Sequence, residues 1–227
     1  MPNYNSCFKN NKIVSVAAFL VLASPFVAAQ QYNMELKGEY ESWDTGSEFG
    51  GETSAVIGGA GLGYYQGDYY AGGGFSTGSY VLNNNSDKTI QRTDLDLVIG
   101  KKIDKQWSLF TGYRFNWLEY SLKGDASATR RENTAGVGLG ASFGLPFTPR
   151  WIAFMSGVVS GLYAFNNFDE SGKGFALGTE GGLLYSVNRK TSIAVRAKYQ
   201  NTKISYDTNR DWTHSYIRLG AHLGYVF

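Results

Sequence analysis

Two pairs of residues have the chemical types that acid–base catalysis needs. Asp94 and Asp96 stand two positions apart, and Asp211 and His214 stand three positions apart near the C-terminus. A histidine oriented by a carboxylate can act as a general base on water. If the fold brings the two pairs together, they are the set to test for hydrolytic chemistry, although our primary expectation is a protein without enzymatic activity.

A Gly-x-Ser-x-Gly motif at residues 74–78 matches the pattern around the nucleophile of serine hydrolases. That pattern has a mechanical basis only on a sharp turn between a strand and a helix. Here it lies inside a segment that predicts a strand, so we interpret the match as coincidence. The chain has two histidines and one cysteine, without a histidine cluster, and we expect neither a metal nor a cofactor.

The elements that position these residues are predicted to be strands. The 227 residues are 43% hydrophobic and 18% charged, which suffices for one folded domain. They include 29 glycines, all of them after residue 30, and glycine costs about 1 kcal/mol in a helix interior relative to alanine. Because no later stretch repeats its apolar residues with helical spacing, we predict an all-β domain.

The N-terminus has the layout of a secretory signal peptide. Lys9 and Lys12 precede an apolar run at residues 13–23, and small residues follow at 27–29. The run is shorter than the roughly 20 residues that a membrane-spanning helix needs. We therefore predict a signal peptide over residues 1–29, which also carries Cys7, and a single domain over residues 30–227.

Removal of the signal peptide changes the charge balance. The loss of its two lysines takes the basic residues from 21 to 19, equal to the 19 acidic residues. A neutral chain without a basic stripe has little to neutralise phosphates with, so nucleic acid is excluded as an expected partner.

Ten segments of alternating residues follow the signal peptide. They span residues 31–43, 53–65, 69–82, 92–103, 107–118, 133–145, 151–163, 174–187, 191–203 and 214–227. Short connections such as 66–68 alternate with longer polar ones such as 119–132, as in transmembrane barrels. We predict an antiparallel up-and-down transmembrane β-barrel of ten strands, with eight strands as the alternative. The faces of segments 53–65 and 151–163 stay unassigned, because both carry small or apolar residues.

Most segments separate an uncharged apolar face from a charged one. A Lys or Arg that faces lipid near the bilayer midplane costs about 2–4 kcal/mol, so we expect the charged face to line the lumen. The predicted lumen charges are Glu35, Lys37, Glu39, Asp94, Asp96, Lys102, Arg114, Glu180, Arg196, Lys198 and Arg218.

The lumen charges are expected to pair. Antiparallel neighbours place Glu180 near Arg196 or Lys198, and closure of the barrel places Glu39 near Arg218. A buried charge that lacks its partner costs about 3–5 kcal/mol. We expect a network that plugs the lumen, with a narrow and weakly selective pore as the alternative.

Aromatic residues gather at the ends of the segments, which predicts two lipid-facing girdles. One group comprises Tyr64, Tyr65, Tyr69, Tyr70, Trp107, Phe147, Trp151, Tyr185 and Tyr225. The other comprises Trp43, Tyr80, Trp117, Tyr120, Tyr163, Tyr206, Trp212 and Tyr216.

The C-terminal residues Gly220, Leu223, Tyr225 and Phe227 resemble the assembly signal of bacterial outer-membrane β-barrel proteins. In the common form of that signal a glycine lies five positions before the terminal aromatic residue, where this chain has His222. The resemblance to that class covers the chain after residue 30. In size the chain is similar to the small OmpA and OmpX barrels, and in strand number to the longer omptin proteases.

The resemblance implies a location and partners. It implies a monomer in the outer membrane of a Gram-negative bacterium, in contact with membrane lipid and lipopolysaccharide and inserted by the barrel assembly machinery with periplasmic chaperones. An omptin-like hydrolase is the enzymatic alternative, because omptins place an Asp pair opposite an Asp–His pair at the outer rim. A soluble ligand-binding barrel is the third possibility.

Overall fold

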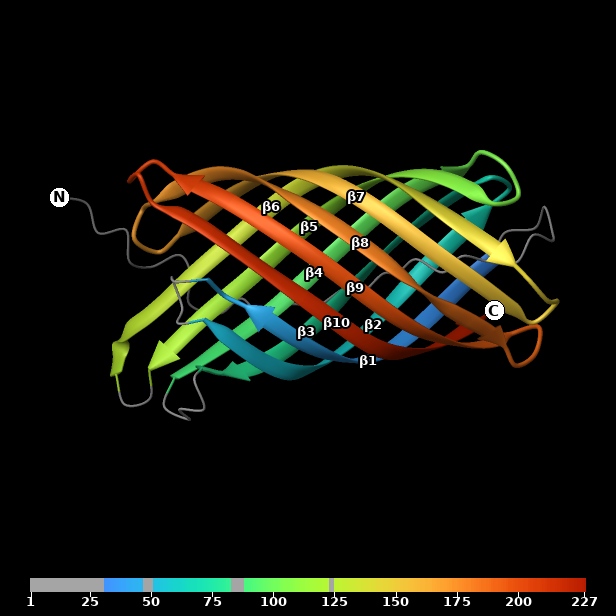
Figure 1. Ribbon diagram of the computed structural model, residues 1–227, viewed down its shortest axis with the longest axis horizontal. Helices are drawn as coiled ribbons and strands as arrows, with labels where there is room; N and C mark the ends of the chain where they lie inside the picture. The colour runs from blue at the N-terminus through green and yellow to red at the C-terminus, as the bar shows by residue number, and fades with distance from the viewer. Residues whose placement is uncertain (1–30, 47–50, 83–87, 123–124) are drawn as a thin grey trace.

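The computed structural model describes residues 31–46, 51–82, 88–122 and 125–227, which form ten strands (Figure 1). The predicted signal peptide lies outside the described residues. The strands are β1 (Gln31–Asp44), β2 (Glu52–Gln66), β3 (Tyr69–Val81), β4 (Lys88–Lys102), β5 (Trp107–Leu122), β6 (Asp125–Pro146), β7 (Trp151–Asn166), β8 (Ser171–Ser186), β9 (Thr191–Tyr206) and β10 (Asp211–Val226).

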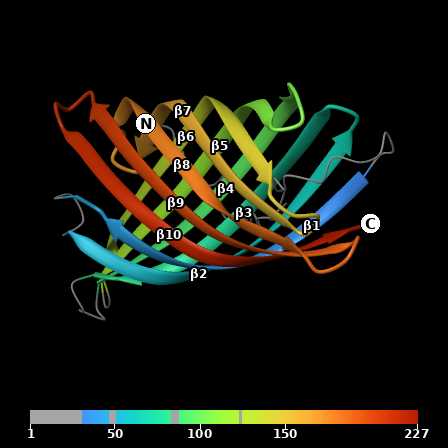
Figure 2. The ribbon, with the colours of Figure 1, turned by 45° about the vertical axis from the view of Figure 1, so that its right-hand side comes forward.

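The ten strands close into one antiparallel barrel. Each strand pairs with the next along the chain, and β1 pairs with β10 from Asn33 opposite Val226 to Asp44 opposite Ser215. The strands run obliquely around the barrel (Figure 1, Figure 2). Closure removes the unpaired edges of the sheet, as a β-structure in hydrocarbon requires. The prediction of ten strands is confirmed, and the eight-stranded alternative is wrong.

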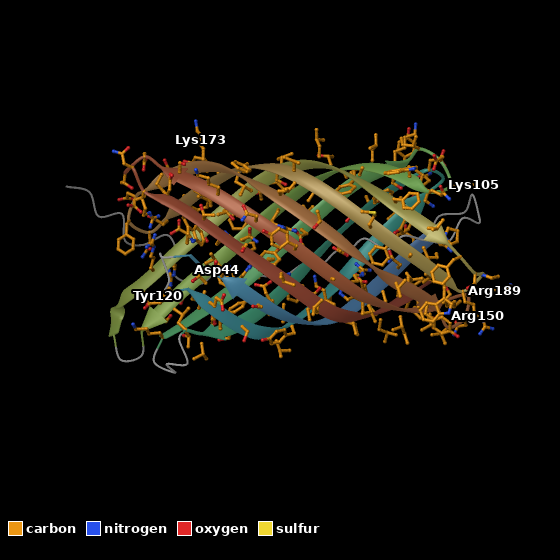
Figure 3. All side chains as sticks on the ribbon, in the orientation of Figure 1. Asp44, Lys105, Tyr120, Arg150, Lys173 and Arg189 are labelled. Atoms are coloured by element: carbon orange, nitrogen blue, oxygen red, sulfur yellow. The ribbon has the colours of Figure 1, made fainter. Side chains whose placement is uncertain are left out.

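The barrel has two distinct ends. The turn end carries Gln31, Phe227 and the connections at 67–68, 103–106, 147–150 and 187–190, and the loop end carries the other five connections. Lys105, Arg150 and Arg189 mark the turn end in Figure 3, and Asp44, Tyr120 and Lys173 mark the loop end. Phe227 donates its backbone N–H to the carbonyl of Tyr32 over 3.0 Å, which fixes the C-terminus at the turn end.

Side chains alternate between lumen and exterior along every strand. Odd-numbered residues point inward in β1 and β2, and even-numbered residues point inward in β3 to β10. This pattern assigns the two strands that the sequence left open. In β2, Ile57 is 2% exposed and its neighbour Val56 is 78% exposed. In β7, Ala164 is buried while Met155 and Val159 are exposed.

Several connections at the loop end are shorter than the sequence predicts. β5 and β6 run through most of the predicted loop 119–132, and β4 begins at Lys88 instead of residue 92. Outward-facing Arg131 donates to Glu119 over 3.0 Å across the β5–β6 hairpin. Paired polar side chains allow this hairpin to continue past the apolar band, whereas the sequence prediction ended each strand where its apolar alternation stopped.

No helix among the described residues is long and apolar enough to cross a membrane.

Candidate functional site

A cluster of buried aromatic and aliphatic side chains, which we call the closing cluster, packs in the lumen near the loop end. Trp43 and Tyr80 have no exposed surface, and Trp212 and Tyr216 are 1% exposed. Trp43 meets Tyr80 edge to face, with 5.1 Å between the ring centroids. The closing cluster is completed by Ala55, Ile57, Leu82, Ile90, Leu118, Ala164, Ile204 and Tyr206, with Tyr120 and Leu162 packed against it.

Hydrogen bonds fix the two indoles of the closing cluster. Trp43 Nε1 donates to Nδ1 of His214 over 3.2 Å, and Trp212 Nε1 donates to the carbonyl oxygen of Thr45 over 2.9 Å. The His214 ring stacks on Trp212 at 4.3 Å. Because buried indole N–H groups need acceptors, these bonds allow tryptophan to fill the lumen.

The closing cluster corrects the predicted girdle at the loop end. Of that group only Trp117 and Tyr163 are exposed on the outer face. Trp43, Tyr80, Tyr206, Trp212 and Tyr216 are buried in the lumen, and Tyr120 packs against them. The sequence prediction assigned these residues by their position along the strand, and the inward or outward alternation decides their face.

The girdle at the turn end is largely present. Tyr69, Trp107, Phe147, Trp151 and Tyr225 are exposed on the outside. Two members of the predicted group, Tyr65 and Tyr70, point inward and are buried, so they do not belong to the girdle.

An ionic network lies next to the closing cluster and centres on Arg218. Arg218 donates to Glu41 and to Asp94, and its Nη1 lies 3.7 Å from Glu39. Arg92 contacts the same two carboxylates, Glu41 at 2.9 Å and Asp94 at 2.8 Å. All these side chains are buried. Two arginines thus share two carboxylates, and this arrangement compensates the cost of burying each charge.

The network is joined to the closing cluster through Tyr80, whose hydroxyl donates to Glu41 over 2.6 Å. Neither Glu41 nor Arg92 was predicted from the sequence as a lumen charge. Glu41 continues the series of inward odd-numbered residues Glu35, Lys37 and Glu39, so the alternation along the strand predicts its inward position. Arg92 shares the even parity of Asp94 but lay at the predicted boundary of its strand.

A second group of charges lies closer to the turn end. Arg196 donates to Glu35 over 2.6 Å and to Glu180 over 3.2 Å. His222 bridges two carboxylates, with Nδ1 2.9 Å from Glu35 and Nε2 3.1 Å from Glu39. His222 was not among the predicted lumen charges, because the prediction counted only permanently charged side chains.

The remaining predicted lumen residues also point inward. Arg114 donates to Asp96 and to Gln200. Lys102 lies at the turn end with its Nζ 5.9 Å from the centre of the Tyr65 ring. Lys37 and Lys198 line a cavity of about 180 Å³ beside the ionic network.

The four candidate catalytic residues are brought together only in part: Asp94 lies within electrostatic range of His214, whereas Asp211 lies apart from both. Asp94 and Asp96 lie in the middle of β4, not near its outer end as expected, because β4 begins four residues earlier than predicted. Both are bound by arginines. His214 points inward and accepts from Trp43, while Asp211 is exposed on the other face of β10, 3.9 Å from Lys203. An Asp–His pair cannot form across two faces of one strand.

The predicted assembly-signal residues lie on both faces of β10. Leu223 and Tyr225 face outward, and Phe227 is exposed at the turn end. Gly220 faces inward, and a Cβ there would lie 2.8 Å from the carbonyl oxygen of Gly38. Only glycine therefore fits at this position of the β1–β10 contact.

Among the residues that the structure describes, no three His, Cys, Asp or Glu side chains are grouped to hold a metal ion.

The outer face of the closed sheet is apolar. Its exposed large side chains come from several strands and include Leu97, Val137, Leu139, Val195 and Leu219. An exposed apolar patch of this extent marks contact with membrane or another protein. A closed sheet with an apolar exterior and an ionic interior suits hydrocarbon surroundings. The chain has an outer-membrane β-barrel fold.

The chain is similar to several solved structures at low sequence identity. The β domain of the Bordetella autotransporter BrkA is 13% identical, with 86% of this chain and 98% of that chain covered at a TM-score of 0.49. Neisserial surface protein A is 10% identical over 86% and 96% of the two chains at 0.48. The outer membrane protease OmpT from Escherichia coli is 12% identical over 91% and 99% at 0.46. These similarities concern the fold alone.

No protein-family model matches the sequence, and no curated protein matches it.

Proposed function

We propose that the protein is a non-enzymatic barrel of the outer membrane of a Gram-negative bacterium, with a lumen closed to solutes. Its role is then structural or depends on its surface loops. The observation that carries this proposal is the closing cluster, in which the buried side chains of Trp43, Tyr80 and Trp212 fill the lumen. The Arg218 network next to it provides a second, ionic layer of closure.

The proposed location depends on export and insertion. Residues 1–29 would direct export and be cleaved, and the C-terminal residues of β10 would be recognised by the barrel assembly machinery after transport by periplasmic chaperones. The mature barrel would act as a monomer in contact with lipid and lipopolysaccharide. The outward apolar side chains support this proposal over a soluble ligand-binding barrel, which would bury such a surface.

Single-channel conductance tests the closure. In planar bilayers the wild-type protein should give no regular channels. The double variant Trp43→Ala, Trp212→Ala removes two indoles from the lumen and should produce stable conductance. Trp117→Ala is the matched control, because Trp117 lies near the same end but faces outward. Regular wild-type channels would contradict the proposal and support the narrow pore.

A rim hydrolase like the omptins receives less support from the geometry, because Asp211 and His214 lie on opposite faces of β10. Peptide cleavage by the purified protein that disappears in His214→Ala would reverse this choice.

A further inference from the structure

The cavity beside the ionic network is lined by both apolar and charged side chains. Phe110, Phe154, Val158 and Leu184 contribute apolar surface, and Lys198 is among the charged residues of the lining. The cavity measures about 180 Å³. An apolar protein cavity of about 150 Å³ holds one benzene molecule. The cavity therefore has room for one benzene-sized ring that carries one small substituent.

Lys198 is a lumen cation that lines the cavity. In the strand register it stands directly opposite Arg218 on β10 and opposite Glu180 on β8. Glu180 is held by Arg196 at 3.2 Å. Within the described part of the chain Lys198 forms no ion pair, and its Nζ lies 5.8 Å from the centre of the Tyr216 ring.

The surroundings of Lys198 favour an added negative charge. Like charges directly opposite each other on neighbouring strands destabilise a sheet, and Lys198 faces Arg218 in this way. Lys37 also lies within electrostatic range of both. Asp96 lies within electrostatic range of Lys198, but its carboxylate is bound by Arg114, and the carboxylate of Glu35 is bound by Arg196. The ammonium group of Lys198 is thus the group left to receive an anion.

We propose that this cavity binds a small organic carboxylate with an apolar body about the size of a benzene ring. The carboxylate contacts Lys198, and the apolar body packs against Phe110 and Phe154. Ligand sites combine a mostly apolar lining with a few polar groups that fix orientation, and this cavity has both. A fully hydrated inorganic anion would leave the apolar wall without a partner.

Because the proposed closure lies at the loop end, entry from the turn end, past Leu184, is the route that it leaves for the ligand. Leu184 lines both the cavity and a smaller hollow of about 70 Å³ at the turn end. Leu184 and Ala194 pack with Ile152 and Phe154 into a small apolar cluster at this boundary. The route rests on the proposed closure of the loop end, whereas the binding site itself does not.

Titration calorimetry with benzoate on detergent-purified folded protein tests the site. Benzoate should bind the wild type, and Lys198→Met should weaken binding at least tenfold, which corresponds to about 1.4 kcal/mol. Lys173→Met is the matched control, because Lys173 faces outward on the neighbouring strand β8, and it should bind like the wild type. Benzamide, the uncharged analogue, should bind all three proteins equally weakly.

Equal benzoate affinity in the wild type and Lys198→Met would overturn the proposal, as would a folded wild type that binds no benzoate. If Lys198→Met does not fold, Ser156→Leu replaces it, because Ser156 lines the cavity and leucine would fill it. Binding should then be lost, and unchanged binding would overturn the site. Conductance of the same preparations distinguishes the carboxylate site from the closed lumen. A protein that conducts ions and also binds benzoate would contradict the closed lumen but not the carboxylate site.

Discussion

Arg218 lies at the centre of the charges that fill the lumen. It donates to Glu41 and Asp94 and lies near Glu39, and all four side chains are buried. Removal of one partner from a buried ionic group leaves the others uncompensated. At the scale of single residues, the stability of the lumen should therefore depend more on this arginine than on any exposed pair.

Arg218→Ala should lower the free energy of unfolding by about 3–5 kcal/mol. Arg131→Ala is the control, because it breaks the exposed Arg131–Glu119 pair, which should contribute no more than about 1 kcal/mol. Urea unfolding in micelles, followed by tryptophan fluorescence, measures both. Equal effects of the two variants would contradict the role of the buried network.

Asp104 provides a pH-dependent contact at the turn end. Its Oδ1 accepts the backbone N–H groups of Gln106 and Trp107, each over 2.7 Å. These donors hold the pKa of Asp104 below its ordinary value, because they favour the ionised carboxylate. A lowered folded-state pKa gives stability that is present above the unfolded pKa and lost as the pH falls through the folded one.

Asp104→Ala should therefore unfold more easily than the wild type at neutral pH, and the difference should shrink as the solution is acidified below the folded pKa. Urea unfolding at a series of pH values checks this. Asp104→Asn keeps an acceptor oxygen without a titrating group, so its stability should depend less on pH. If the difference in the free energy of unfolding between wild type and Asp104→Ala grew on acidification, the predicted direction of the pH dependence would be wrong.

At the scale of the strands, inward glycines let larger side chains occupy the lumen. A Cβ at Gly140 of β6 would contact the Phe110 ring and lie 2.5 Å from the carbonyl oxygen of Gly157. At Gly112 of β5 the nearest atom would be the carbonyl oxygen of Leu97 at 3.4 Å. The two positions offer different space for the same added methyl group.

Gly140→Ala should lower the free energy of unfolding by about 1–3 kcal/mol, the usual cost of overpacking. Gly112→Ala should change it little. Heat-modifiable gel migration verifies that both variants fold, and urea unfolding compares them. A larger loss in Gly112→Ala than in Gly140→Ala would show that the inner face is packed differently.

The strands and most of their faces could be predicted from the sequence because charge is excluded from lipid. Where charged residues alternate with apolar ones, as Lys198 does with Val195 and Tyr199 on β9, only one face of the strand can point to lipid. The predicted segments 53–65 and 151–163 lack such charges, so their small residues fit either face. Aromatic residues suit both an interface and a filled lumen, which is why Trp43 and Trp212 were assigned to the wrong face.

The candidate site was predictable in composition but not in arrangement. Parity placed Glu39 and Arg218 on the inner face, and barrel closure placed them near each other. The contacts of Arg218 with Glu41 and Asp94 depend on how far long side chains reach across the lumen, which alternation does not encode. The cavity depends likewise on which inward positions are glycine or serine on adjacent strands.

At the scale of the whole molecule, the sheet separates hydrocarbon from an ionic interior. Leu97 and Val195 are exposed on the outer face, whereas Asp96 and Arg196 line the interior. The closing cluster and the ion pairs then occupy a space from which lipid is excluded.

Spin labels on single cysteines test this claim most directly. In the chain from residue 30 onward, which has no native cysteine, labels at Leu97→Cys and Val195→Cys in bilayers should be relaxed strongly by oxygen dissolved in lipid. A label at Ser142→Cys, an inward position of β6, should be shielded from it. Strong oxygen relaxation at residue 142, with shielding at 97 and 195, would contradict the orientation of the barrel wall.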